Sequence, residues 1–215
     1  VNASALNSGY VCELENLQIP YVLIDRNFEN ATCNKVFCDN SDGGYIGMRY
    51  LLDLGHRRVG IIGGPTHTEP IIRRIEGAKR ALKEIGIPED EILLMTSDTQ
   101  IFDMGYEAAK ELLVLDNPPT AIFALTDVTA VGVIHAIAEL GLSVPGDVSV
   151  LGYDDIPIAS YMIPPLSTVA QPIIEMGRTA VQLLLQNIEN PDQTSERVIL
   201  PTHLVERQST APPRD

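Results

Sequence analysis

The segment 141–155, which reads GLSVPGDVSVLGYDD, decides the fold. Gly141 closes a helical pattern that starts near Asp127, since glycine readily takes the left-handed conformation that follows a helix. Residues 148–152, which read VSVLG, are mostly apolar, which is typical of a β-strand covered on both faces. Two acidic side chains, Asp154 and Asp155, follow this strand directly. A helix, a buried strand and a polar strand end, in that order, predict one repeating unit of a parallel α/β sheet.

The same alternation continues in both directions along the chain. Strands are expected over 21–25, 35–38, 59–63, 92–95, 121–125, 148–152, 197–200 and 203–206. Helices are expected over 41–54, 69–85, 103–115, 127–140 and 172–188, the last with Pro172 at its first position. Residues 168–169 should lead straight into that helix, and the tail 211–215 should be frayed. The predicted fold class is therefore α/β, with parallel sheets that carry helices on both faces.

Length and composition limit the class of protein. The 215 residues suffice for one large α/β unit or for two small lobes. The formal net charge of −14 disfavours DNA binding by this stretch, because phosphate contacts need clustered Lys and Arg. No apolar run approaches the roughly 18 residues that span a bilayer, and the first residues do not resemble a secretion signal. The cysteines, Cys12, Cys33 and Cys38, are few and odd in number, which favours free thiols in a reducing compartment such as the cytoplasm.

Motifs for catalysis or cofactor binding are absent from the sequence. It contains no phosphate loop of the type GxxxxGK[ST], no GxGxxG after a strand, no GxSxG elbow and no HExxH. The histidines, His56, His67, His135 and His203, are scattered without metal-ligand spacing. We therefore expect no metal site, no cofactor and no enzymatic activity, although a catalytic triad assembled in space leaves no local signature.

Polar residues follow almost every predicted strand. In open parallel sheets, ligands bind in the crevice outside the carboxyl ends of the strands. The residues at these positions are Asp25, Asp39, Asn40, Gly63, Gly64, Thr96, Ser97, Asp98, Thr126, Asp127, Asp154, Asp155 and Gln171. They predict a site for a polar ligand. We interpret Asp127 and Asp155 as helix N-caps, and Asp25 and Asp154 as site residues.

Several stretches, in order over nearly the whole chain, resemble the family of lactose, galactose and purine repressors. They are 54–65, 74–77 with 81–82, 121–127, 141–155, 164–171 and 204–207, of which 141–155 is the most specific. The resemblance implies two Rossmann-like lobes of the periplasmic-binding-protein type, with a small effector bound between them. It places crossings between lobes near Asp39, Gln171 and Pro201. One lobe would then combine 1–38 with 172–200, and the other 40–170 with 201–215.

Ahead of the position that Val1 would occupy, the family also has a helix-turn-helix DNA reader, a hinge helix and two further βα units. The two βα units alone comprise about 60 residues. This sequence contains none of these parts. We therefore expect DNA binding only through that missing N-terminal part. We also expect the first lobe to be incomplete here, with open strand edges.

The resemblance implies specific ligand contacts. Arg74 matches a cleft arginine and Asp154 an acidic residue that binds effector hydroxyls or ring nitrogens, and neither is expected to be a packing residue. The further positions are Asn2, Ser4, Asp25, Gln171 and Thr126, the last at a site where many relatives carry Asn. Fixed carboxylates and a guanidinium suit a sugar. The alternative for Arg74 is a solvated helix arginine beside Arg73.

The resemblance also implies a homodimer. The matching interface positions are Val131 and His135 on one helix, with Ile158, Tyr161 and Met162 on the following loop. Ile158 and Met162 share a face if this segment is helical, and the alternative is that they pack inward as core. The predicted function is that of an effector-sensing and dimerisation domain of a bacterial repressor. A periplasmic-type sugar-binding protein and a sugar-processing α/β enzyme remain the alternatives.

Overall fold

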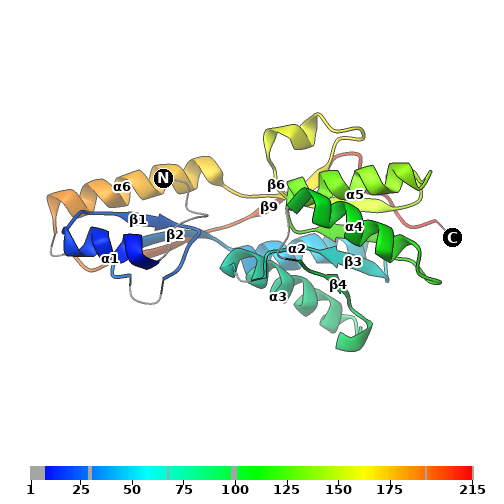
Figure 1. Cartoon of the computed structure of the whole chain (residues 1–215), viewed down its shortest axis with the longest axis horizontal. Coiled ribbons are helices and arrows are strands. Elements are labelled where there is room, and N and C mark those ends of the chain that lie inside the picture. Colours follow the sequence, from blue (N-terminus) through cyan, green and yellow to red (C-terminus); the bar gives the residue numbers. More distant parts are fainter. Residues whose placement is uncertain (1–7, 29–30, 67, 98–100, 192, 215) are drawn as a thin grey trace. The chain divides into compact units, whose positions relative to one another are not determined.

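The computed structural model describes residues 8–28, 31–66, 68–97, 101–191 and 193–214 (Figure 1). The chain divides into two compact units. Unit 1 comprises Val1–Asp39 and Pro172–Pro201, and unit 2 comprises Asn40–Gln171 and Thr202–Asp215. No helix of the described part is both long and apolar enough to cross a membrane.

Unit 2 is built on a six-stranded sheet with the order β4-β3-β5-β6-β7-β9. Its strands are β3 (Val59–Ile62), β4 (Leu93–Met95), β5 (Ala121–Ala124), β6 (Ser149–Asp154), β7 (Ser167–Ala170) and β9 (His203–Val205). All neighbours pair in parallel except β7 and β9, which are antiparallel. The parallel α/β class predicted from the sequence is therefore confirmed.

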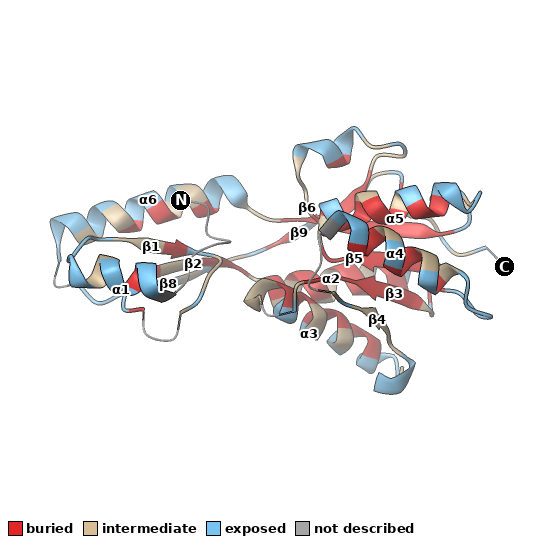
Figure 2. Cartoon of the chain, in the orientation of Figure 1, coloured by how far each residue is buried: buried red, intermediate tan, exposed pale blue. Residues whose placement is uncertain are grey.

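Helices cover both faces of this sheet. They are α2 (Asn40–Asp53), α3 (Glu69–Glu84), α4 (Ile101–Leu113) and α5 (Asp127–Glu139), with short 3-10 helices at Glu89–Glu91 (η2) and Pro157–Ser160 (η3). The side chains of β5 alternate between the two faces. Phe123 joins a core formed with α2 and α3, whereas Ile122 joins a core formed with α4 and α5. Strands β3, β5 and β7 are buried along their whole length and β6 is buried except at Asp154, whereas β4 and β9 are not fully buried (Figure 2).

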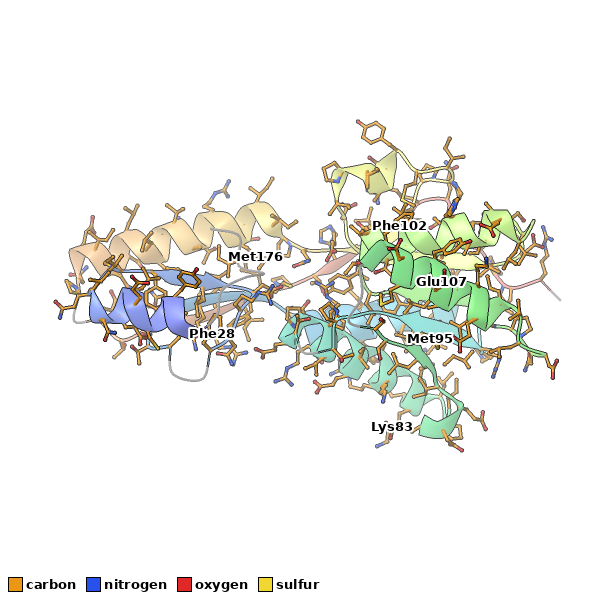
Figure 3. The ribbon with its side chains drawn as sticks, viewed as in Figure 1. Phe28, Lys83, Met95, Phe102, Glu107 and Met176 are labelled. Carbon is orange, nitrogen blue, oxygen red and sulfur yellow. The ribbon has the colours of Figure 1, made fainter. Side chains whose placement is uncertain are left out.

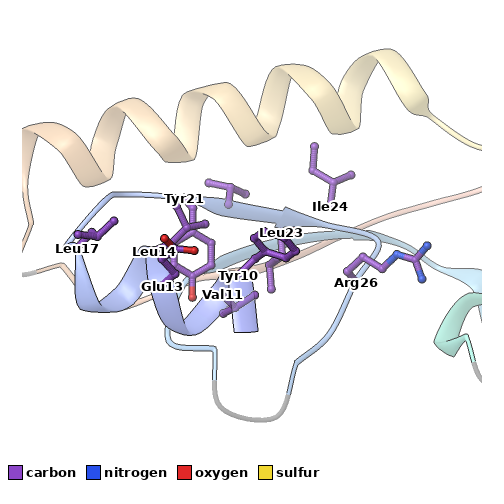
Figure 4. A pocket seen from close by; sticks show the side chains of 10 residues that line it. Tyr10, Val11, Glu13, Leu14, Leu17, Tyr21, Leu23, Ile24 and Arg26 are labelled. Carbon is purple, nitrogen blue, oxygen red and sulfur yellow. The ribbon is translucent and has the colours of Figure 1, made fainter. Parts of the chain in front are cut away.

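Unit 1 contains a three-stranded parallel sheet with the order β1-β2-β8. Its elements are α1 (Ser8–Asn16), β1 (Val22–Ile24), β2 (Asn34–Cys38), α6 (Ile173–Glu189) and β8 (Arg197–Leu200). Met176 packs from α6 into a small cluster with Val36 and Cys38 of β2 (Figure 3). A pocket of about 480 Å³, lined mainly by α1 and β1 and including Tyr10, Leu17 and Leu23, opens beside β1 (Figure 4).

The structure differs from the sequence-based expectations in four places. Residues 167–170 form strand β7 rather than a direct lead into the helix, and Pro172 is the N-cap of α6 rather than its first residue. Helix α1 was not expected. The C-terminal tail is not frayed at Ala211, because its amide and carbonyl both bond to the Ser149 hydroxyl and its carbonyl also bonds to His56 Nε2. Polar contacts between distant segments fix this tail, and no local pattern encodes them.

Candidate functional site

Arg74 lies at the centre of a polar cluster in unit 2. Its side chain is buried, with 3% of the residue exposed. Nε donates to Asn40 Oδ1 at 2.8 Å, and Nη1 donates to the Leu125 carbonyl at 2.6 Å. Nη1 also lies 3.0 Å from Asp154 Oδ1, and the guanidinium carbon lies 3.7 Å from the centre of the Tyr153 ring. The interpretation of Arg74 as a solvated arginine is therefore wrong, and so is the expectation that it has no packing role.

The packing of α2 against α3 explains this position. At Gly44 a Cβ would overlap the Arg74 carbonyl, and at Gly77 it would overlap the Ser41 carbonyl, so only glycine lets the two helices approach this closely. The close approach brings Arg74 to Asn40 at the start of α2. Arg73, the next residue along α3, is on the exposed side and pairs with Glu76 at 3.0 Å.

Asp154 ends β6 in a conformation that is unusual for a side-chain-bearing residue. Its φ is +116°, and Asp155 follows with φ +55°. Such positions cost about 1–3 kcal/mol each and persist only where the surroundings hold them. Gln171 Nε2 donates to Asp154 Oδ1 at 2.6 Å, so Gln171 and Arg74 fix the same carboxylate. The Asp154 side chain keeps 18% of its surface exposed, so the cluster reaches the surface.

The sequence-predicted residues Arg74, Asp154 and Gln171 thus come together. Asn40 and Tyr153 complete the cluster although they were not among the predicted ligand contacts. Asn40 did appear among the polar strand ends, and Tyr153 is part of the GYDD segment, so both carried a signal that could have marked them.

Thr126 has a local role at the start of α5. Its Oγ1 accepts from the Thr129 amide at 3.1 Å, and the two hydroxyls lie 2.8 Å apart. Thr126 is therefore the N-cap of this helix. The neighbouring Leu125 carbonyl accepts from Arg74, which places the end of β5 beside the cluster.

Asp25 belongs to unit 1, at the end of β1. It has φ +52°, and its amide donates to the Val36 carbonyl at 2.8 Å. Its Oδ1 lies 3.9 Å from Cys38 Sγ, which places it as an acceptor for the thiol. Asn2 and Ser4, the other predicted contacts near the start of the chain, lie outside the described residues.

Two residues interpreted as helix N-caps have other roles. Asp127 is fully buried, and its carboxylate accepts from the Ile156 amide at 2.8 Å and the Thr168 hydroxyl at 2.6 Å. Burial raises the pKa of this carboxyl to about 7. Asp155 pairs with Arg207 at 2.7 Å. The cap interpretation is wrong for both, because Thr126 takes the cap of α5 and Ile156 takes the cap of η3.

The residues predicted at a dimer interface lie on α5 and around η3. His135 is exposed, with its ring centre 5.4 Å from that of Tyr106, and Val131 is half-buried. Ile158 and Tyr161 are exposed, by 52% and 81%. The Met162 amide donates to the Ile158 carbonyl at 3.1 Å, and the Met162 side chain packs against the core beside α5.

Cysteines and metal-ligand groups add no second site. Cys12 is exposed, Cys33 and Cys38 are buried, and none of these described cysteines is in a disulfide. Within the described ranges, no group of His, Cys, Asp and Glu has a geometry that could hold a metal ion.

Comparisons with curated proteins identify relatives of the whole chain. The family model for the periplasmic binding protein-like domain matches residues 48–210. The chain is 37% identical to the ribose operon repressor of Haemophilus influenzae over 193 residues, 90% of this chain and 58% of that protein. It is 37% identical to the HTH-type transcriptional repressor PurR of Klebsiella pneumoniae over 198 residues, 92% of this chain and 58% of that protein. The chain thus spans less than two thirds of the length of these relatives.

Solved structures give the same answer. A LacI family transcriptional regulator from Enterococcus faecium, with bound ribose, matches with a TM-score of 0.90 and 34% identity, over 99% of this chain and 78% of that chain. The complex of the transcriptional regulator CelR with cellobiose matches with a TM-score of 0.83 and 33% identity, over 91% of this chain and 60% of that chain. By sequence and by structure, this chain belongs to the periplasmic binding protein-like domain family and, within it, to the LacI family of transcriptional regulators.

Proposed function

We propose that this chain is the effector-sensing part of a bacterial transcription repressor, and that it binds a small sugar at Arg74, Asp154 and Gln171. The observation that carries the proposal is the buried Arg74 guanidinium, which holds the partly exposed Asp154 carboxylate in one orientation. A regulator of this kind binds its ligand without converting it, so the proposal excludes an enzyme.

The chemistry of the cluster suits a polyhydroxy ligand. A carboxylate accepts hydrogen bonds from neighbouring hydroxyls, and guanidinium and amide groups donate to ring and hydroxyl oxygens. Because Arg74 and Gln171 already hold Asp154, little side-chain entropy remains to be lost when a ligand binds. This preorganisation favours a small, rigid, polar molecule.

The two regulators described above that were solved with a ligand both hold a sugar. The regulator from Enterococcus faecium was solved with bound ribose, and CelR was solved with cellobiose. The relative from Haemophilus influenzae is a ribose operon repressor. D-ribose is therefore the first ligand to test.

The proposal extends to the remaining predicted residues and partners. Asp25, Thr126, Asn2 and Ser4 stay predicted ligand contacts, and units 1 and 2 are proposed to correspond to the two effector lobes of the family. Binding to operator DNA would require a DNA reader outside this sequence, because the net charge of −14 opposes contact with phosphates. Such a repressor would act in the cytoplasm. A homodimer would use Val131, His135, Ile158, Tyr161 and Met162.

Calorimetric titration with D-ribose and cellobiose tests the proposal. Asp154→Asn keeps the shape but loses the charge, and it should weaken binding roughly 10- to 150-fold, the value of a hydrogen bond to a charged group. Asp53→Asn is the matched control, because Asp53 is an exposed carboxylate of the same unit that pairs with Arg49 at the surface. Equal affinity of Asp154→Asn and the parent protein, or no sugar binding by the parent, would contradict the proposal.

A further inference from the structure

Asp127 is a buried carboxyl group that the proposed ligand contacts do not explain. It is 0% exposed, whereas Asp154 and Asp155 keep part of their surface. Burying a carboxylate without opposite charge is costly, and among the described residues its hydrogen-bond partners, Ile156 and Thr168, carry no charge. A group retained under such a cost has a specific structural or functional use.

The two hydrogen bonds of Asp127 join three elements of unit 2. The residue itself opens α5, its Oδ1 accepts from Thr168 of β7, and its Oδ2 accepts from the Ile156 amide just after β6. Gly152 of β6 completes this packing, because a Cβ there would overlap Asp127 Oδ1. The carboxyl group therefore fills the space between β6, β7 and the N-terminus of α5.

The Ile156 amide is the contact that matters for the ligand site. Asp154, the last residue of β6, and Asp155 directly precede this amide, and their φ angles are +116° and +55°. Left-handed conformations at two successive residues with side chains revert to extended or helical conformations unless both ends of the turn are held. The pairing of Asp154 with Ala170 holds one end, and Asp127 holds the other.

We propose that Asp127 is a positioning residue of the ligand site: by holding the Ile156 amide, it keeps the Asp154 carboxylate turned toward Arg74 and Gln171. This inference rests on the proposed function, because it assigns Asp127 to the same site. Asp155 contributes to the same turn through Arg207, whose Nη1 also donates to the Leu166 carbonyl.

The protonation state of Asp127 decides which substitution preserves its role. The acidic groups that face it are Asp154 and Asp155, which pair with Arg74 and Arg207. Burial raises the pKa of Asp127 to about 7, so both forms are populated at neutral pH. In the acid form, Oδ1 can donate to Thr168 while Oδ2 still accepts from Ile156. Asparagine reproduces this arrangement, with its amide group donating to Thr168 and its oxygen accepting from Ile156.

The test compares three variants with D-ribose as the probe. Asp127→Ala removes the bond to Ile156 and should weaken ribose binding at least about tenfold. Asp127→Asn should restore most of that affinity. Thr168→Val removes only the bond on the far side of the carboxyl group, so it should lower the unfolding midpoint while the affinity stays within about threefold of the parent. If Asp127→Ala does not fold, Asp127→Ser replaces it. The serine side chain keeps a polar group but is too short to bond to both Ile156 and Thr168.

A purely structural role would give a different result. Asp127→Ala and Thr168→Val would then both lower stability and leave the affinity of the folded protein unchanged, and that outcome would overturn the inference. If the parent does not bind ribose, the proposed function fails, and hydrogen exchange of the Ile156 amide then tests the inference separately. Faster local exchange in Asp127→Ala than in a Thr168→Val variant of equal stability supports the positioning role, and equal exchange refutes it.

Discussion

Units 1 and 2 follow the same alternation of strands and helices but bury their apolar residues to different extents. In unit 2, strands β3, β5 and β6 are each flanked by strands on both sides, and residues such as Ile61, Phe123 and Val150 are fully buried. Among the described residues of unit 1, only strand β2 has a neighbouring strand on each side. An apolar strand pattern therefore determines which side chains point toward the core. The number of paired strands determines how many of those side chains become fully buried.

Helix α6 shows the consequence for unit 1. Met176, Ala180 and Leu183 face the strands and are buried. Another stripe on the same helix remains exposed, with spacings of seven, four and three residues: Ile174 by 80%, Val181 by 57%, Leu185 by 54% and Ile188 by 55%. This helix therefore buries only part of its apolar surface. Unit 1 gains less stabilisation from it than it would if all the apolar side chains of the helix were buried.

The largest predicted difference concerns local stability. Hydrogen exchange followed by mass spectrometry should show amides of β2, at Val36 and Phe37, exchanging at least about 1,000-fold faster than those of β5, at Ile122 and Phe123. This ratio corresponds to about 4 kcal/mol between the two opening reactions. Equal protection of β2 and β5 would mean that the two units open together, and it would contradict the expected difference in their local stability.

The next effect concerns the pH dependence of the stability of unit 2. The folded-state pKa of Asp127 is raised to about 7, so its neutral form is favoured in the fold and its charged form in the unfolded chain. Stability from this group is fully present below pH 4 and is lost as the pH rises from about 4 to about 7, by on the order of 4 kcal/mol at about 1.4 kcal/mol per pKa unit. Urea unfolding of the parent should show this loss relative to Asp127→Asn. Parallel pH profiles of the two proteins would contradict the assigned cause.

His56, in the same unit, changes the pH dependence of stability in the opposite direction. Burial lowers its pKa, so its contribution is present above pH 6.5 and is lost as the pH falls. The comparison of the parent with Asp127→Asn cancels this contribution, because both proteins keep His56 and its bonds to Thr120 and Ala211.

The smallest effect is expected on the exposed stripe of α6. Ile174→Gln and Leu185→Gln should each change the free energy of unfolding by no more than about 0.5 kcal/mol, because these side chains are already in water. Leu183→Ala, on the buried side of the helix, is the control and should cost about 2–5 kcal/mol. A large loss from either glutamine substitution would show that the stripe is covered in solution.

The sequence predicted most strands of unit 2 because their buried faces are continuous apolar runs. It missed β7, whose residues Ser167 and Thr168 are polar but bond to Thr210 and Asp127 inside the unit. Helix α1 was missed because, among its residues whose burial is described, only Val11 joins a core cluster, which leaves no clear apolar period.

At the candidate site, the helical pattern of α3 indicates that Arg74 lies on its buried face and Arg73 on its exposed face. Arg74 shares the buried face with Ile71, Ala78 and Leu82, at spacings that a helical pattern reveals. The roles of Asp127 and Asp155 could not be predicted from the sequence. Asp127 bonds to Ile156 and Asp155 bonds to Arg207, and in each pair the partners are far apart in the chain and are brought together by the fold.

The most direct test of the central claim is a crystal structure of this chain grown with D-ribose. We expect density for the sugar in unit 2, with a hydroxyl within about 3 Å of the Asp154 carboxylate and another within reach of Arg74 or Gln171. Ribose bound at another place, with Arg74, Asp154 and Gln171 in contact only with one another, would contradict it.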